Sequence, residues 1–289
     1  MASKEINSQQ RIELDLWDNI SNPYPFNALK SAYPHHIFYR LDTKGHKFTA
    51  FLTHDFGFPT TSKNIFDVLI DKIWFPKDLH HRFIDLERKY NAVSTFFIPI
   101  NRFRSALFAS RFSKETSKDF EIGLQIGHKA ALNPKALIKE KEFLERTTGR
   151  VVVSSRYRNL TYQGKKTIEQ LQRVGFTYDS SFGYRNAIGF RGGISFPFRP
   201  YELGVIEIPF TIRDTVLTDI GLTPKETLNL VFKLIDASST NNGTITINWH
   251  LDYTTLNEWS NLYEKVLEYL VKKDARFLTL RETTKALIK

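Results

Sequence analysis

The chain has 289 residues, of which 41 are basic and 31 acidic, so its formal net charge is +10. It contains no cysteine, which excludes disulfides, thiolate catalysis and cysteine-ligated metals. The basic residues are dispersed among acids rather than gathered in a run, so we expect no nucleic-acid partner. No stretch of about 18 apolar residues exists, so we expect no membrane span. Residues 1–10 are polar and lack the apolar segment of a signal peptide, which favours a cytoplasmic protein.

The first part of the chain differs in pattern from the rest. Residues 1–46 lack periodicity and contain Asn-Pro-Tyr-Pro and Tyr-Pro-His-His, so we predict an irregular N-terminal lead-in. Over residues 47–289, strand and helix signals alternate, which is typical of βα units around a parallel sheet. Because no linker-like segment interrupts this alternation, one domain is expected.

Short, almost entirely apolar runs mark strands that are buried on both faces. Helix starts lie between them, such as Asn133-Pro134 and the capping box from Thr223 to Glu226. His80 and His81 fall in a helix-like stretch and are expected at the surface or between helices. The predicted strands lie near 48–54, 93–99, 120–125, 150–155, 204–209, 244–249 and 276–280.

Aspartate and histidine residues follow three of these strands. His54 and Asp55 end the first, His128 follows the third, and His250 follows another together with Asp252. Parallel strands present their carboxyl ends at one rim, where catalytic groups gather. Successive strand residues point to opposite faces, so His54 and Asp55 are not both expected in one pocket. Asp252 is a candidate to orient the His250 imidazole.

From about Lys47 to about Glu282, the order of these segments resembles the polysaccharide deacetylase (NodB-homology, carbohydrate esterase family 4-like) family. The segments that correspond to its successive motifs are Thr53–Gly57, Glu121–His128, Ser155–Tyr162 and Asn248–His250. The stretches Gly175–Gly183 and Gly189–Gly193 are similar to a divergent subgroup associated with surface-polysaccharide loci.

The resemblance implies an α/β fold, a distorted (β/α)7-type barrel with parallel strands in a single domain. It implies a hydrolase that removes acetyl groups from an N-acetylated sugar or a sugar-containing glycan precursor, with a divalent, zinc-like metal. Asp55 would be the base and His250 the acid beside the leaving group, while Arg156 would position Asp55. His54 and His128 are the residues available as metal ligands.

The substrate expected from this resemblance is a carbohydrate or a nucleotide-linked sugar. Arg191 and Arg199 flank a rigid loop, and guanidinium groups bind carboxylate or phosphate with two hydrogen bonds. Trp249 and Tyr162 are candidates for a wall on which a sugar ring stacks. The positive net charge also fits an anionic substrate.

Several positions depart from the family pattern. Phe56 and Gly57 offer no second acid after Asp55, and Gln125 and Lys129 stand where two histidines are expected. A catalytic metal usually needs about three protein ligands and an open position, so the ligand set implied by the family is incomplete.

Two alternatives to the deacetylase remain open. The first is a catalytically silent carbohydrate-binding or assembly protein on the same fold, because Lys129 is electrostatically hostile to a bound cation. The second is a glycoside hydrolase, which needs two carboxylates that flank the scissile bond; Asp55 and Asp252 would be that pair.

Overall fold

The described part of the chain forms one curved sheet surrounded by helices. The computed structural model describes residues 22–56, 79–100, 102–160, 162–251 and 258–288. The strands are β1 (His36–Phe38), β2 (Phe48–Asp55), β3 (Ser94–Pro99), β4 (Glu121–Ile126), β5 (Ser154–Tyr157), β6 (Tyr178–Asp179), β7 (Phe198–Pro200), β8 (Ile206–Glu207), β9 (Ile212–Arg213), β10 (Thr244–Asn248) and β11 (Ala275–Phe277).

The strand order is β1-β7-β8-β6-β5-β4-β3-β2-β10-β9, and β11 pairs with β2. All of these pairs are parallel except β1 with β7 and β7 with β8. The sheet curls into a half-barrel with mostly parallel strands, which confirms the predicted barrel-like α/β fold.

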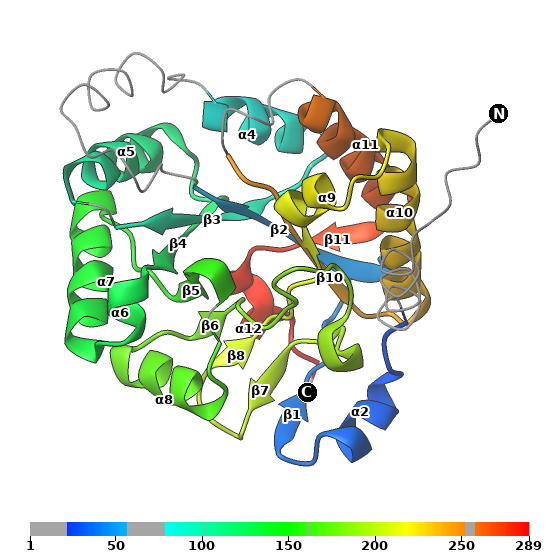
Figure 1. Ribbon diagram of the computed structural model, residues 1–289, viewed down its shortest axis with the longest axis horizontal. Helices are drawn as coiled ribbons and strands as arrows, with labels where there is room; N and C mark the ends of the chain where they lie inside the picture. Colours follow the sequence, from blue (N-terminus) through cyan, green and yellow to red (C-terminus); the bar gives the residue numbers. More distant parts are fainter. Residues whose placement is uncertain (1–21, 57–78, 101, 161, 252–257, 289) are drawn as a thin grey trace.

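Helices cover the outer face of the half-barrel (Figure 1). The α-helices are α2 (Phe26–Ala32), α4 (Leu79–Lys89), α5 (Arg102–Glu115), α6 (His128–Ala131), α7 (Pro134–Thr148), α8 (Lys165–Val174), α9 (Asp214–Asp219), α10 (Pro224–Thr240), α11 (Glu258–Lys272) and α12 (Thr283–Ala286). Short 3-10 helices lie at Arg158–Leu160, Arg191–Gly193 and Leu280–Glu282. Among the described helices, none is both long and apolar enough to cross a membrane.

The alternation of β2 decides which of its side chains can reach the barrel interior. Phe48 and Leu52 pack in the large core cluster beneath the helices, whereas Phe51 packs in the interior cluster with residues of the C-terminal segment. His54 shares the outer face with Phe48 and Leu52, and Asp55 shares the inner face with Phe51, as the two-residue period requires. All eight residues of β2 are buried.

A glycine on β4 leaves room for an aromatic ring close to the backbone of the sheet. A Cβ atom on Gly123 would lie 2.7 Å from Cδ1 and Cε1 of Phe97, closer than such atoms can approach. The ring of Phe97 therefore occupies the space that a side chain at 123 would fill. The guanidinium carbon of Arg156 lies 4.4 Å from the centre of that ring, so Gly123 helps to position Arg156 through Phe97.

The structure corrects several boundaries predicted from the sequence. The strand expected at 150–155 begins only at Ser154, after an exposed Val151. The lead-in expected to be irregular over 1–46 contributes α2 and β1, and β1 pairs with β7. The short strands β6, β7 and β9 were also not predicted, because segments of two or three residues carry too little periodicity.

Candidate active site

Asp55 lies at the carboxyl end of β2 on the inner face of the sheet and is only 6% exposed. Its Oδ1 accepts a hydrogen bond from Nη1 of Arg156 at 3.2 Å. Its Oδ2 accepts one from Nδ2 of Asn248 at 3.1 Å. Arg156 comes from β5 and Asn248 from β10, so residues of two other strands fix the two carboxylate oxygens of Asp55.

Arg156 is buried and all of its guanidinium nitrogens donate hydrogen bonds. Nε and Nη2 bind the carbonyl and the hydroxyl of Ser180 at 2.8 and 3.0 Å. Nη1 also binds Oδ1 of Asn248 at 2.8 Å. The guanidinium carbon lies 4.4 Å from the ring centre of Phe97 and 5.2 Å from that of Phe210. These partners hold the cation in one orientation against Asp55.

His250 follows β10 and its imidazole is fixed by a buried aspartate on another element. Nδ1 donates to Oδ1 of Asp214 at 2.6 Å, and the backbone N–H of His250 donates to Oδ2 at 2.7 Å. Nε2 then faces Oδ2 of Asp55 at 3.9 Å, which is too long for a direct hydrogen bond. Asp214 begins α9, and Asp252, the orienting residue expected from the sequence, lies outside the described residues.

Opposing effects set the pKa values of Asp55 and His250. Burial alone would raise the pKa of Asp55, but the positive charges of Arg156 and of protonated His250 hold it below its ordinary value. Burial would lower the pKa of His250, but Asp214 and Asp55 together raise it above the usual value. At neutral pH these shifts favour a carboxylate that can accept a proton beside an imidazolium that can donate one.

The structure thus brings Asp55, Arg156 and His250 together at the carboxyl ends of β2, β5 and β10. The sequence predicted such a shared cleft because all three residues follow strand ends, with Arg156 identified by the resemblance to the deacetylase family. What the sequence missed is Asp214, which lies 36 residues before His250. No local signal distinguishes this aspartate from any other residue that begins a helix.

Comparison with solved structures agrees with the fold. A protein from Mycobacterium smegmatis assigned as a polysaccharide deacetylase is 16% identical with a TM-score of 0.61, over 83% of this chain and 90% of that one. A protein from Pseudomonas aeruginosa PAO1 with the same assignment is 14% identical with a TM-score of 0.61, over 82% and 89% of the two chains. A mutant of a carbohydrate esterase family 4 pseudoenzyme is 13% identical with a TM-score of 0.51, over 83% and 67%.

This chain has the polysaccharide deacetylase fold. The similarity is confined to three-dimensional structure, since comparison of the sequence with protein-family models gives no match and comparison with curated proteins gives no significant one. The resemblance predicted from the order of the sequence motifs is confirmed at the level of the fold.

His54, predicted from the sequence as a metal ligand, lies on the outer face of the sheet, opposite to Asp55. It is fully buried, its Nδ1 lies 2.8 Å from the carbonyl oxygen of Trp249, and its Nε2 lies 2.7 Å from Oε1 of Glu87. Tyr263 and Ser94 donate to the same Glu87 carboxylate. Both ring nitrogens are therefore engaged in the core, which corrects the expectation that His54 binds a metal at the rim.

The remaining strand-end positions do not fit the metal that the deacetylase fold implies. Phe56 stands where a second acid is expected, and its ring packs 4.4 Å from that of Phe108. Gln125 is in register with Arg156 and offers a neutral amide whose Oε1 has no hydrogen-bond partner among the described residues. His128 is exposed at the start of α6 and lines a hollow beside Tyr157. No catalytic step is therefore assigned to a metal at this rim.

The four predicted substrate-binding residues separate into different environments. Trp249 is fully buried and its ring centre lies 5.0 Å from that of Tyr263, so the expectation of sugar stacking on Trp249 is corrected. Arg191 and Tyr162 both contact Phe182, at 4.8 and 5.6 Å. Arg199 lies on β7 and its guanidinium carbon is 5.7 Å from the Tyr39 ring.

A second buried acid pair, not predicted from the sequence, supports the segment that holds Arg156. Oδ1 of Asp179 accepts from the Ser155 hydroxyl at 2.6 Å. Oε1 of Glu207 accepts from the backbone N–H groups of Ser181 and Phe182 at 2.9 and 2.8 Å. Both carboxyls are fully buried. Burial first, and the adjacent Asp179 second, raise the pKa of Glu207 well above its ordinary value.

Glu207→Gln is expected to stabilise the protein at neutral pH. A group whose pKa is higher in the folded state stabilises below its unfolded-state pKa, and this contribution is lost as pH rises through the folded-state pKa. Glutamine keeps the acceptor oxygen but cannot ionise, so the advantage of the variant over wild type should grow from pH 5 to pH 8. Urea unfolding at both values measures it, with the exposed Glu202→Gln as control. If the extra stability of Glu207→Gln over wild type shrinks with rising pH, the pKa of Glu207 is not raised in the folded state.

Proposed function

We propose that this chain is a deacetylase-like hydrolase that acts on an N-acetylated sugar or on a sugar-containing glycan precursor. The observation that carries the proposal is the paired arrangement of Asp55 and His250. Asp55 is fixed by Arg156 and Asn248, and His250 is fixed by Asp214. Nε2 of His250 faces Oδ2 of Asp55 at 3.9 Å. A protein that only binds sugar has no need of a base and an acid held in this way.

In the proposed reaction, Asp55 takes a proton from a water molecule while the water oxygen attacks the carbonyl carbon of the acetamido group. The C–N bond then breaks, and His250 gives its Nε2 proton to the departing nitrogen. The products are acetate and the free amino sugar. Arg156 keeps Asp55 ionised and oriented, and Asp214 keeps the Nε2 proton of His250 directed at the reaction centre.

We infer the substrate class from the basic residues of the chain. Arg191 contacts the ring of Phe182. Phe182 comes two residues after Ser180, whose carbonyl oxygen accepts a hydrogen bond from Arg156. With Arg199 and the net charge of +10, this cation favours a sugar that carries a carboxylate or phosphate, such as a nucleotide-linked sugar.

A catalytically silent carbohydrate-binding protein is the second candidate. It is favoured by Phe56 and Gln125, which occupy ligand positions implied by the family, and by the lowered pKa of Asp55, which weakens it as a base. A carbohydrate esterase family 4 pseudoenzyme shares the fold.

Release of acetate from N-acetylated oligosaccharides and nucleotide-linked N-acetyl sugars, followed by NMR, tests the proposal. Wild type should release acetate, and His250→Gln should do so about 100-fold more slowly, at the lower end of the usual contribution of an acid catalyst, because glutamine still donates a hydrogen bond but no proton. His46→Gln changes an exposed histidine paired with Asp274 and should leave the rate unchanged. Binding of the same sugars without any acetate release would favour the silent protein.

A further inference from the structure

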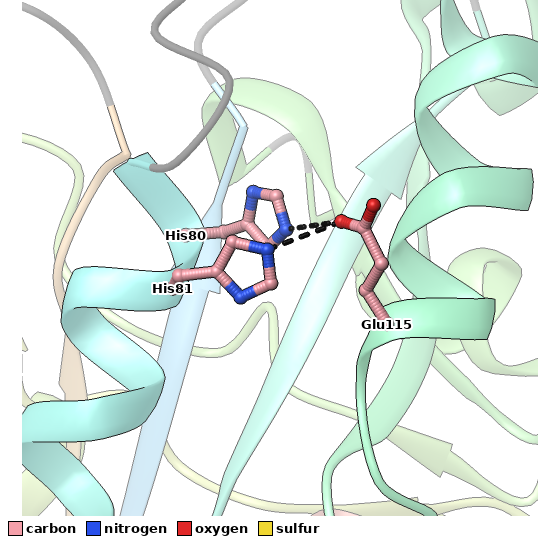
Figure 2. A group of neighbouring side chains, drawn as sticks. All are labelled: His80, His81 and Glu115. Carbon is pink, nitrogen blue, oxygen red and sulfur yellow. Dashed lines mark hydrogen bonds and ion pairs between the residues drawn. The ribbon is translucent and has the colours of Figure 1, made fainter.

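Two adjacent histidines and a glutamate from different helices meet on the outside of the half-barrel. His80 and His81 lie at the start of α4, and Glu115 ends α5 (Figure 2). Oε2 of Glu115 lies 3.5 Å from Nε2 of His80 and 3.1 Å from Nε2 of His81. One ligand atom from each residue lies within 4.8 Å of the others. The sequence suggested only a surface or interhelical position for the two histidines.

The spacing of these atoms approaches that of a tetrahedral metal site. Zinc binds imidazole nitrogen and carboxylate oxygen at about 2.0–2.2 Å, so two ligand atoms at a tetrahedral angle lie about 3.3–3.4 Å apart. The two distances from the glutamate oxygen, 3.5 and 3.1 Å, are within about 0.3 Å of that value. Small rotations of the side chains would therefore bring all three atoms to bonding distance of one ion.

The burial of His80 gives this cluster a feature that a surface ion pair lacks. His80 is only 4% exposed, and its Nε2 has no hydrogen-bond partner among the described residues. Its ring packs against Phe108 and Phe112, with centroid distances of 5.6 and 5.4 Å. Packing therefore directs the Nε2 atom of His80 toward His81 and Glu115, although its only contact there is the 3.5 Å ion pair with Glu115. A buried polar atom without a hydrogen bond is costly unless a ligand satisfies it.

Arg111 holds the Glu115 carboxylate in place through the oxygen that does not face the histidines. Nε of Arg111 donates to Oε1 of Glu115 at 2.6 Å, which leaves Oε2 directed at the two imidazoles. An outer partner of this kind orients a ligating carboxylate. Arg111 also places a positive charge near the cluster, so it lowers the affinity for a cation below that of an uncompensated site.

The cluster is distinct from the proposed catalytic centre. Asp55 faces the barrel interior, whereas the next residue, Phe56, packs on Phe108 on the outer side. His80 packs on the same Phe108 ring. An aromatic layer therefore separates the cluster from the end of β2.

We propose that His80, His81 and Glu115 bind one divalent transition-metal ion of the zinc type, which joins α4 to α5. Two imidazoles and one carboxylate are ligands that zinc accepts. The side chains of His81 and Glu115 are 33% and 32% exposed, so a fourth position is accessible to water or to a ligand from outside. A metal bound only by the folded state stabilises that state by an amount that grows with the logarithm of the free metal concentration once this exceeds the dissociation constant.

Titration of the chelator-treated, full-length protein with zinc by calorimetry, and with cobalt by visible absorption, tests this site. Wild type should bind one equivalent, with the strong visible bands of four-coordinate cobalt, and zinc should raise its unfolding temperature. Glu115→Gln and His81→Gln should each weaken binding by at least about 100-fold, beyond the 10- to 100-fold cost of losing an outer partner. His46→Gln and Asp55→Asn should bind zinc as wild type does.

Three results would overturn the proposal: no zinc binding by wild type, unchanged binding in both cluster variants, or loss of zinc binding in Asp55→Asn with retention in Glu115→Gln. The last would place the metal at the strand ends instead. His81 is one-third exposed, so His81→Gln keeps the test valid if Glu115→Gln does not fold. Binding is measured without substrate, so its outcome is independent of whether the protein deacetylates a sugar.

Discussion

Asp55→Asn is expected to lower the turnover number for acetate release by about 10³- to 10⁴-fold, the upper part of the range for removal of a catalytic base. Asparagine has almost the same volume as aspartate but cannot take a proton from water. Both oxygens of Asp55 accept hydrogen bonds, one from Arg156 and one from Asn248, so an amide in this place keeps the shape of the carboxylate but loses one of these acceptors together with the basicity. Initial rates on the best substrate of the wild type measure the effect.

A matched control separates loss of the base from loss of the fold. Asp85→Asn makes the same chemical change on α4, where Asp85 forms an exposed ion pair with Arg88; its rate should be that of wild type. Circular dichroism should show that Asp55→Asn is folded under the assay conditions, although Arg156 loses its charged partner. Wild-type turnover in folded Asp55→Asn would remove Asp55 from the reaction.

Arg156→Met is expected to lower the free energy of unfolding by about 3–5 kcal/mol at neutral pH, the cost of breaking a buried ion pair from one side. Methionine fills part of the space between Phe97 and Phe210 but leaves Asp55 as a buried charge without its cation. Urea unfolding followed by circular dichroism measures the loss. Arg88→Met, which removes an exposed arginine, should change stability by less than about 0.5 kcal/mol.

The pH dependence of this loss has a definite sign. In wild type, Arg156 helps to hold the pKa of Asp55 below its unfolded value, so this stabilisation is present above the unfolded pKa and is lost as pH falls through the folded one. Without Arg156, the effect of burial raises the pKa, and the variant should be closest to wild type at low pH. The double variant Arg156→Met/Asp55→Asn should regain part of the loss at pH 8. If Arg156→Met loses the same unfolding free energy at pH 4 and at pH 8, the loss does not come from the ion pair between Arg156 and Asp55.

The sequence alone determined the features that depend on short-range pattern. Buried strands carry continuous apolar runs, so six of the strands lie within or close to the predicted places: β2, β3, β4, β8, β10 and β11. The two-residue period of a strand was enough to place His54 and Asp55 on opposite faces of the sheet. The parallel arrangement of strand ends, together with the resemblance that identified Arg156, predicted Asp55, Arg156 and His250 as neighbours, although Asp55 and Arg156 lie 101 residues apart.

Only the tertiary structure decided which groups surround these residues. Asp214 lies beside His250, Glu87 hydrogen-bonds His54 in the core, and Trp249 is fully buried. Sequence periodicity reports which face of an element is buried but not what that face meets. Pairs such as Asp179 with Glu207 are brought together by strand order, and Glu115 reaches His80 because two helices pack on one sheet. These contacts depend on the packing of distant segments, which leaves no local signal in the chain.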